Sequence, residues 1–199
     1  KGMFLAFIGV IFITPDSLLI RLANLTSWNM IFYRGFIPFF IVFVSLLIIY
    51  KNKFISQLLE NGWHGVAYAV IFSITNIFFV ISINNTNVAN TLIMIALAPM
   101  LSAVISFIFL KESTDQKTWI AITITTLAVI YIFNDSFERG DILGNFLGLV
   151  CATGLATGAV IIRSAKKINL VPSAMMGKAL VVLIALFFIK NPILKGSDL

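Results

Sequence analysis

Charged side chains are scarce in this chain. They make up 11% of its 199 residues, whereas 60% of the residues are hydrophobic. An average soluble domain has about 25% charged and roughly 45–50% apolar residues, and it could not bury this much apolar material. A lipid environment removes that difficulty. The composition therefore excludes an ordinary soluble domain and predicts an integral membrane protein.

Cysteine and histidine are almost absent. The single cysteine, Cys151, cannot form an intrachain disulfide, and the single histidine, His64, has no cysteine or histidine partner at metal-ligand spacing. We therefore expect no metal and no cofactor. The same scarcity argues against a membrane-embedded enzyme, which would need clustered groups for acid–base or nucleophilic chemistry. The net charge of +6 lies in short loops without interleaved aromatics, so no nucleic acid partner is expected.

Long apolar runs dominate what is present. A helix that crosses the hydrocarbon core needs about 20 apolar residues, and these runs lack the alternation of a membrane barrel. The sequence therefore predicts an all-α bundle of transmembrane helices. The expected spans are residues 3–23, 30–50, 65–83, 88–110, 118–133, 142–162 and 171–189.

Loop cations predict the orientation. Eight lie on the N-terminal side of the expected bundle: Lys1, Lys51, Lys53, Lys111, Lys117, Arg163, Lys166 and Lys167. Three lie on the other side: Arg139, Lys190 and Lys195. Because cytoplasmic loops are enriched in lysine and arginine, the N-terminus is expected in the cytoplasm of a multi-pass cell-membrane protein, in a bacterium the inner membrane.

The start of the chain resembles a later part of it, at an offset of 142 to 144 residues. The matching pairs are Gly2 with Gly144, Phe4 with Phe146, Ile20 with Ile162, Arg21 with Arg163 and Arg34 with Lys178. A repeat of five spans enters the membrane from the opposite side the second time, as in many secondary transporters. Chance similarity between apolar helices is the alternative. The repeat predicts a first unit at residues 1–134 and an incomplete second unit at 142–199, with seven spans of an expected ten.

Several motifs occur in an order and spacing that resemble a known family. The fourth run carries a proline near its middle, at the end of the stretch Thr91–Pro99. The chain then reads Phe-Leu-Lys-Glu at 109–112, where this run ends. The fifth run begins Trp-Ile-Ala-Ile-Thr-Ile at 119–124, the first run contains Thr-Pro-Asp-Ser-Leu-Leu-Ile-Arg at 14–21, and the sixth run contains Gly-Asn-Phe-Leu-Gly at 144–148. These features resemble the EamA family of the drug/metabolite transporter superfamily, along the whole chain. The missing C-terminal part is the departure from the family pattern.

The resemblance implies a fold of ten spans in two halves and the export or uptake of amino acids, other metabolites or drugs through a central cavity. It does not imply one substrate. Since no nucleotide-binding motif is visible, we expect secondary transport by alternating access, with proton coupling through Asp16 or facilitated exchange both left open. A receptor-like seven-span protein or a channel is the alternative, and the oligomeric state is left open.

Asp16 is the only carboxylate well inside an expected span. It and Arg34 lie about 10 Å and 6 Å below the outer ends of their helices at 1.5 Å per residue. Ionisable groups at membrane depth are functional candidates, so we expect a buried Asp16–Arg34 pair or a shared polar cavity. The alternative is that Asp16 caps a break at Pro15 while Arg34 extends to the headgroups.

Further polar side chains fall within the expected spans. Lys178 is deep enough to contact an anion, or it extends to the interface. The uncharged side chains either line a wet cavity or form hydrogen bonds between helices. The remaining substrate-binding candidates are Ser73, Asn76, Asn90, Thr91 and Thr157.

Proline and glycine predict the helix geometry. Pro99, at the middle of the fourth run, should kink its helix because it lacks a backbone N–H. The sixth run carries small residues at the four-residue spacing that lets membrane helices approach closely. These packing candidates are Gly144, Gly148, Gly154 and Gly158.

Overall fold

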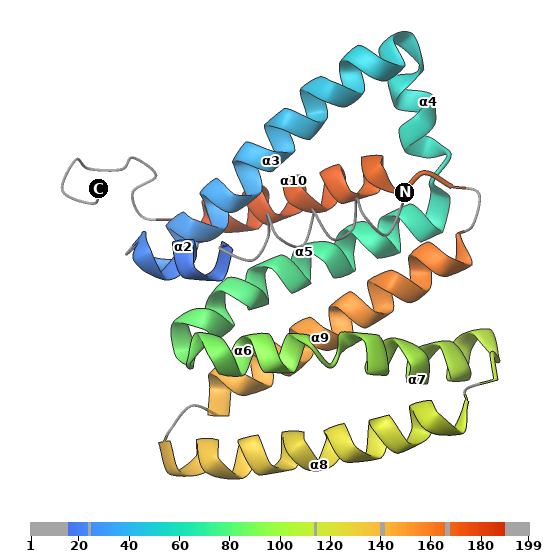
Figure 1. The fold of residues 1–199 in the computed structure, drawn as a ribbon. Helices are drawn as coiled ribbons and strands as arrows, with labels where there is room; N and C mark the ends of the chain where they lie inside the picture. The colour runs from blue at the N-terminus through green and yellow to red at the C-terminus, as the bar shows by residue number, and fades with distance from the viewer. Residues whose placement is uncertain (1–15, 24, 114, 140–141, 166–167, 190–199) are drawn as a thin grey trace.

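The computed structural model describes residues 16–23, 25–113, 115–139, 142–165 and 168–189, and the regular structure within them is helical (Figure 1). The helices are α2 (Asp16–Leu22), α3 (Ser27–Tyr50), the 3-10 turn η1 (Lys51–Lys53), α4 (Phe54–Leu59), α5 (Gly62–Asn85), α6 (Val88–Ile95), α7 (Ala98–Leu110), α8 (Gln116–Arg139), α9 (Ile142–Ser164) and α10 (Val171–Phe188).

Five segments among the described residues are long and apolar enough to cross a membrane. They are Ser27–Leu59, Gly62–Asn85, Val88–Leu110, Ile142–Ser164 and Val171–Phe188. Each overlaps one expected span, and Ser27–Leu59 extends beyond the expected span at 30–50 into the following loop. The fifth expected span lies within α8, which is not among the five, and most of the first lies outside the described residues. That these two also cross the membrane stays a prediction.

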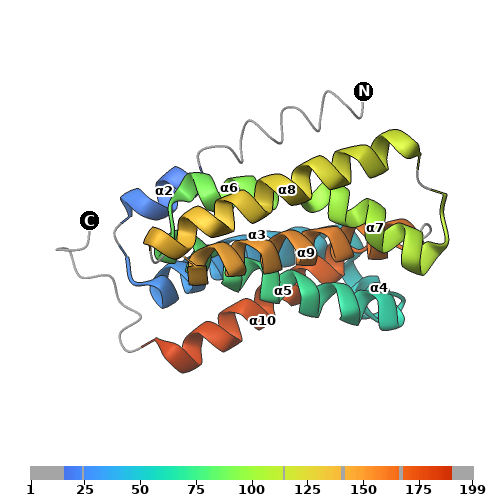
Figure 2. The same cartoon turned by 90° about the horizontal axis from the view of Figure 1, so that it is seen from below.

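The helices pack in an order that differs from their order in the chain. Helix α10 lies between α3 and α5, α5 packs on α9, and α9 packs on α6 and α7 with α8 beyond them (Figure 1). Seen from below, the long helices run roughly along one direction (Figure 2). Trp28 at the start of α3 stacks on Phe188 at the end of α10, so these two helices are antiparallel. Helices α3, α5 and α10 thus enclose a common interface in this part of the bundle.

Two expected loops contain helix instead. Helix α8 extends to Arg139, so most of the connection between the expected spans at residues 118–133 and 142–162 is helical. The loop between the second and third spans contains η1 and α4. Hydropathy marks where a helix leaves the hydrocarbon, but intrahelical hydrogen bonds persist beyond that depth, so the apolar run underestimates helix length.

The fourth span is interrupted near Pro99. Helix α6 ends at Ile95, α7 begins at Ala98, and the amide of Leu97 donates to the carbonyl of Met94 at 3.1 Å, in a tighter turn. Proline has no N–H for the carbonyl four residues earlier and its ring crowds that carbonyl. The structure therefore divides this span into two helices at the position where the sequence predicts a kink.

Helix α9 lies very close to α5 and α6. A Cβ at Gly144 would lie 2.6 Å from the main-chain carbonyl carbon of Asn85, and one at Gly148 would lie 3.2 Å from the Cβ of Met94. A Cβ at Gly154 would overlap Thr75, whereas Gly158 has room beside Tyr68. Small residues thus allow the closest helix approach of the bundle, as the four-residue spacing predicts.

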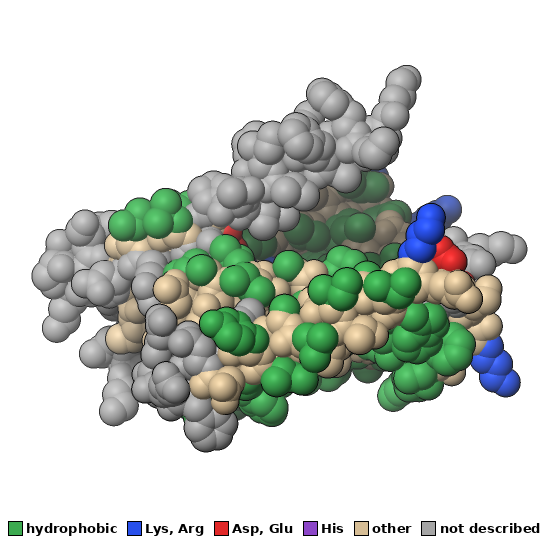
Figure 3. Space-filling model, turned by 60° about the horizontal axis from the view of Figure 1, so that its bottom comes forward, with side chains coloured by type: hydrophobic (Ala, Val, Ile, Leu, Met, Phe, Trp, Pro, Cys, Tyr) green, Lys and Arg blue, Asp and Glu red, His purple; other side chains and the backbone are tan. Residues whose placement is uncertain are grey.

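Apolar side chains cover much of the outer surface. Phe40, Ile48 and Ile49 on α3 are between 56% and 68% exposed, and on α8 Ile124 and Leu127 are each 62% exposed. On the face drawn in Figure 3, hydrophobic side chains spread along the helices, while most of the visible charged side chains gather near one end. Such a surface suits contact with lipid acyl chains and not with water.

Candidate functional site

Three polar side chains from three helices meet at the interface of α3, α5 and α10. Arg34, Asn76 and Lys178 line one small internal space, which is too narrow to admit a water molecule. We call these three residues, together with Asp16, the central cluster. The rest of the lining is Ile31, Gly35, Val80 and Val181.

Arg34 forms an ion pair with Asp16. Its Nε donates to Oδ1 of Asp16 at 3.3 Å, its Nη2 donates to Oδ2, and both side chains are partly buried. The guanidinium carbon also lies 4.6 Å from the ring centroid of Phe79, a favourable cation–π geometry. Helix α2 therefore supplies the carboxylate and α3 the cation of this pair. The sequence predicts the contact from the similar depths of the two residues in their expected spans.

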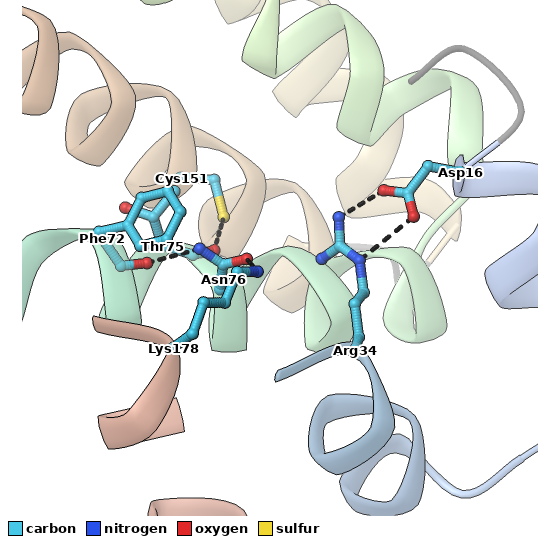
Figure 4. Close-up of polar contacts among 7 residues, drawn as sticks. All are labelled: Asp16, Arg34, Phe72, Thr75, Asn76, Cys151 and Lys178. Carbon is cyan, nitrogen blue, oxygen red and sulfur yellow. Dashed lines mark hydrogen bonds and ion pairs between the residues drawn. The ribbon is translucent and has the colours of Figure 1, made fainter. Parts of the chain in front are cut away.

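Lys178 is held by an uncharged partner. Its ammonium donates to Oδ1 of Asn76 at 2.6 Å and lies 5.3 Å from the ring centroid of Phe72. The amide nitrogen of Asn76 donates in turn to the main-chain carbonyl of Phe72 at 2.7 Å. Figure 4 shows this pair beside the Arg34–Asp16 pair. The ammonium of Lys178 thus lies inside the bundle and does not extend to the headgroups.

Close backbone approach brings these groups together. A Cβ at Gly177 would lie 2.8 Å from the carbonyl oxygen of Ala69, and one at Gly35 would lie 3.0 Å from Cγ1 of Val181. Glycine at both positions lets α10 fit closely between α3 and α5. Arg34, Asn76 and Lys178 lie about 10–15 Å from the helix ends on the expected outer side, at 1.5 Å per residue. They therefore share one depth near the middle of the bundle.

The sequence matches the EamA-like transporter family over residues 1–134, more than half of its length. The chain belongs to this family. It is accordingly a multi-pass membrane transporter of the drug/metabolite transporter superfamily, and the family is not one of enzymes. No curated protein and no solved structure matches the sequence. The five long apolar helices agree with this membership.

Two predicted site residues of this EamA-family chain form hydrogen bonds within their own helices. The buried hydroxyl of Ser73 donates to the carbonyl of Val70 at 2.8 Å. The hydroxyl of Thr157, on α9, donates to the carbonyl of Thr153 at 2.8 Å. Neither residue lines the space that the central cluster encloses. A direct substrate role for them stays a prediction without support from these contacts.

Asn90 and Thr91 belong to a second polar cluster. Ser82 bonds with Thr91 at 2.9 Å between their hydroxyl oxygens and donates to the carbonyl of Gly144 at 2.7 Å. Asn90 donates to the hydroxyl of Thr86, which itself donates to the side-chain carbonyl of Asn145 at 2.9 Å. This hydroxyl network joins α5, α6 and α9, so its contacts match the interhelical alternative that the sequence also allowed.

Sequence reasoning missed the aromatic part of the central cluster. Phe72 and Phe79 lie four residues before and three after Asn76, which places all three on one face of α5. Aromatic rings on the same helix face as a mid-span amide favour the binding of a cation there, because ring faces attract cations. The signal was obscured because phenylalanine is also common on lipid-facing surfaces, and the EamA-family chain has 19.

A charged pocket lies where the C-terminal ends of α7 and α9 meet the start of α8. Nη2 of Arg163, at the end of α9, is 3.0 Å from Oε2 of Glu112, just after α7. Ser106 is buried beside it, and its hydroxyl has no hydrogen-bond partner among the described residues. The pocket lining is Ala103, Ser106, Glu112, Ser113, Asp115, Thr118 and Arg163. This pocket is more exposed than the central cluster, and its ion pair connects the ends of two spans.

Proposed function

We propose that this chain moves small metabolites across the membrane by secondary transport with alternating access, and that the central cluster is part of its substrate site. The observation that carries the proposal is the meeting of Arg34, Asn76 and Lys178 from three helices around one space. Charged groups at membrane depth are expensive and are usually retained for substrates or ions.

The contacts of the cluster support a binding role over a purely structural one. Ile31, Val80 and Val181 give the space an apolar lining, while Arg34 and Lys178 supply hydrogen-bond donors. Ligand sites typically combine a mostly apolar lining with a few placed polar groups. Because the space admits no water here, we interpret this arrangement as a closed one, and binding requires α3 and α10 to move apart.

The expected inverted repeat supplies a reason for that movement. Arg34 and Lys178 are equivalent positions of the two proposed repeats, and their helices α3 and α10 are adjacent and antiparallel, as an odd number of spans per repeat requires. In a ten-span protein, relative movement of α3 and α10, the equivalent helices of the two repeats, would open this central space to each side in turn. The Gly35 and Gly177 contacts would let α10 slide.

The orientation and coupling belong to the same proposal. The loop cations favour a cytoplasmic N-terminus in a cell membrane, which in a bacterium is the inner membrane. Asp16, paired to Arg34, is the carboxylate through which a proton gradient would act; exchange of one substrate for another is the second route.

Counterflow in proteoliposomes tests the proposal. Vesicles containing the full chain are loaded with one unlabelled metabolite at a time, from a panel of acids, amines and amino acids, and uptake of the labelled compound is measured. We expect at least one compound to accumulate with wild type and with Lys53→Gln, a loop-charge control, and not with Lys178→Gln. Uptake equal to that of empty vesicles for the whole panel would contradict transport.

A further inference from the structure

The charges of the central cluster do not balance. Arg34 is paired with Asp16, whereas Lys178 has only a neutral amide and an aromatic ring as its described partners. Two cations and one carboxylate leave one positive charge in excess at the centre of the membrane-spanning bundle. An unpaired charge in a low-dielectric environment is unfavourable, and a bound anion would offset it.

The sequence offers Lys178 no other acidic partner at this depth. Residues 1–15 contain no aspartate or glutamate, and neither do the five apolar segments that can cross the membrane. Outside Asp16, the acidic residues lie near the expected membrane surfaces. They are Glu60, Glu112, Asp115, Asp135, Glu138, Asp141 and Asp198.

Lys178 also retains hydrogen-bonding capacity. An ammonium group has three donors, and the described structure assigns one of them to Asn76. Asn76 orients the ammonium without neutralising it, because its carbonyl oxygen accepts from Lys178 while its amide group is fixed on the carbonyl of Phe72. Two donors therefore remain, and a carboxylate accepts two hydrogen bonds readily.

The apolar part of the lining restricts the rest of the ligand. Ile31, Val80 and Val181 provide only apolar contacts. A second positive group on the ligand, such as the ammonium of an amino acid, would meet no unpaired carboxylate and would be repelled by the excess charge. The geometry favours a single anionic group attached to a short apolar body.

We propose that the substrate site binds monocarboxylates, with the carboxylate on Lys178 and the apolar body against Ile31, Val80 and Val181. This inference rests on the proposed function for the location of the site. It goes further because it selects a carboxylate without an amine over both a neutral compound and a zwitterion.

Three probes with one carbon skeleton test this selectivity. They are 4-methylpentanoate, 4-methylpentanamide and leucine, which are anionic, neutral and zwitterionic respectively. Binding to the full chain in nanodiscs is measured by titration calorimetry. We expect 4-methylpentanoate to bind about tenfold or more tightly than the other two, as loss of a charge-assisted contact predicts. Equal affinities, tighter leucine binding, or no binding of 4-methylpentanoate would overturn the proposal.

Variants assign the selectivity to Lys178. Lys178→Gln and Asn76→Asp should both abolish the preference for the anion, the first by removing the charge and the second by placing a carboxylate beside the ammonium. Lys178→Arg and the loop control Lys53→Gln should keep it. In Asn76→Asp the lysine is still present and is paired with the new carboxylate. This variant therefore tests the role of the Lys178 charge in anion preference even where Lys178→Gln is poorly folded. A preference that survives Asn76→Asp overturns the proposal.

Binding and transport fail separately. Counterflow of all three probes at equal rates would leave transport standing and reject carboxylate selectivity. Selective binding of 4-methylpentanoate without counterflow would reject the proposed transport and retain the selectivity of the site.

Discussion

The two sides of α5 differ in how they satisfy polar groups. On one side, facing α3 and α10, the central cluster contains charged groups that are partly buried, and Lys178 there has a neutral partner. On the other side, facing α6 and α9, the hydroxyls of Ser82 and Thr91 are fully buried and bonded to each other and to Gly144. Mutually satisfied neutral groups hold helices together, whereas charges with spare bonding capacity are available to a ligand.

The backbone contacts show the same difference. On the α9 side, a Cβ at Gly144 would meet main-chain atoms of Asn85, which cannot move independently of their helix. On the α10 side, a Cβ at Gly177 would also meet a main-chain atom of α5, the carbonyl oxygen of Ala69, but one at Gly35 on α3 would meet only the side-chain methyls of Val181 and Val182, which can adjust. We therefore interpret α5–α9 as the fixed interface of the bundle and α3–α10 as the adjustable one.

The largest expected effect comes from breaking the fixed interface. Gly144→Leu should destabilise the protein by about 3 kcal/mol or more, because the new side chain overlaps the α5 backbone and forces α9 away. Thermal unfolding in detergent, followed by size-exclusion chromatography, measures the loss. Gly158→Ala is the matched control on the same helix, since its Cβ would lie 3.5 Å from the Tyr68 ring, an ordinary contact. Similar unfolding temperatures for the two variants would contradict the distinction.

Removing the ion pair on the adjustable side should affect transport more than stability. Arg34→Ala and Asp16→Asn should each lower the uptake of 4-methylpentanoate about tenfold or more, because each leaves one charged member of the pair without its partner beside the substrate space. Membrane insertion should stay intact and is checked by the yield of monodisperse protein. Wild-type uptake rates in both variants would reject a role for the pair.

The hydroxyl network offers the opposite test. Ser82→Ala should destabilise the bundle by about 0.5–2 kcal/mol, the magnitude typical of hydrogen bonds between membrane helices, while the preference for 4-methylpentanoate over its amide stays unchanged. Ser45→Ala is the control, because that exposed hydroxyl bonds only the carbonyl of Ile41 in its own helix. A changed ligand preference in Ser82→Ala would show that the two sides are not separate.

The smallest effect is expected at the charged pocket. Arg163 and Glu112 are 59% and 37% exposed, so Arg163→Gln should change stability by less than about 1 kcal/mol at physiological salt. Repeating the unfolding measurement at high salt should reduce the difference further, since the ions screen an exposed pair. A larger, salt-independent loss would mean that this pair is part of the fixed interface.

The sequence predicted the position of residues along the helix axis better than the side of the helix on which they lie. Apolar runs located the long helices, and counting residues from the span ends placed Asp16 and Arg34 close enough to pair. The four-residue glycine spacing on α9 likewise predicted a close helix approach. These inferences succeed because bilayer thickness and helical rise fix position along a helix.

Rotation about the helix axis was not predictable in the same way. Lipid-facing and packed faces are equally apolar, so hydropathy does not show which neighbour a polar residue will face. For this reason Asn90 and Thr91 could not be separated from Asn76, although the first two bond Thr86 and Ser82 and the last meets Lys178. The contact between Lys178 and Asn76 depends on α10 lying between α3 and α5, which requires tertiary information.

The most direct test of the account is the accessibility of the central space from both sides of the membrane. A cysteine at Val181→Cys, in a Cys151→Ala background, is exposed to a membrane-impermeant thiol reagent added either inside or outside oriented proteoliposomes. We predict modification from both sides, slowed by 4-methylpentanoate and not by its amide. Modification from one side only, or from neither, would contradict a central site that opens alternately.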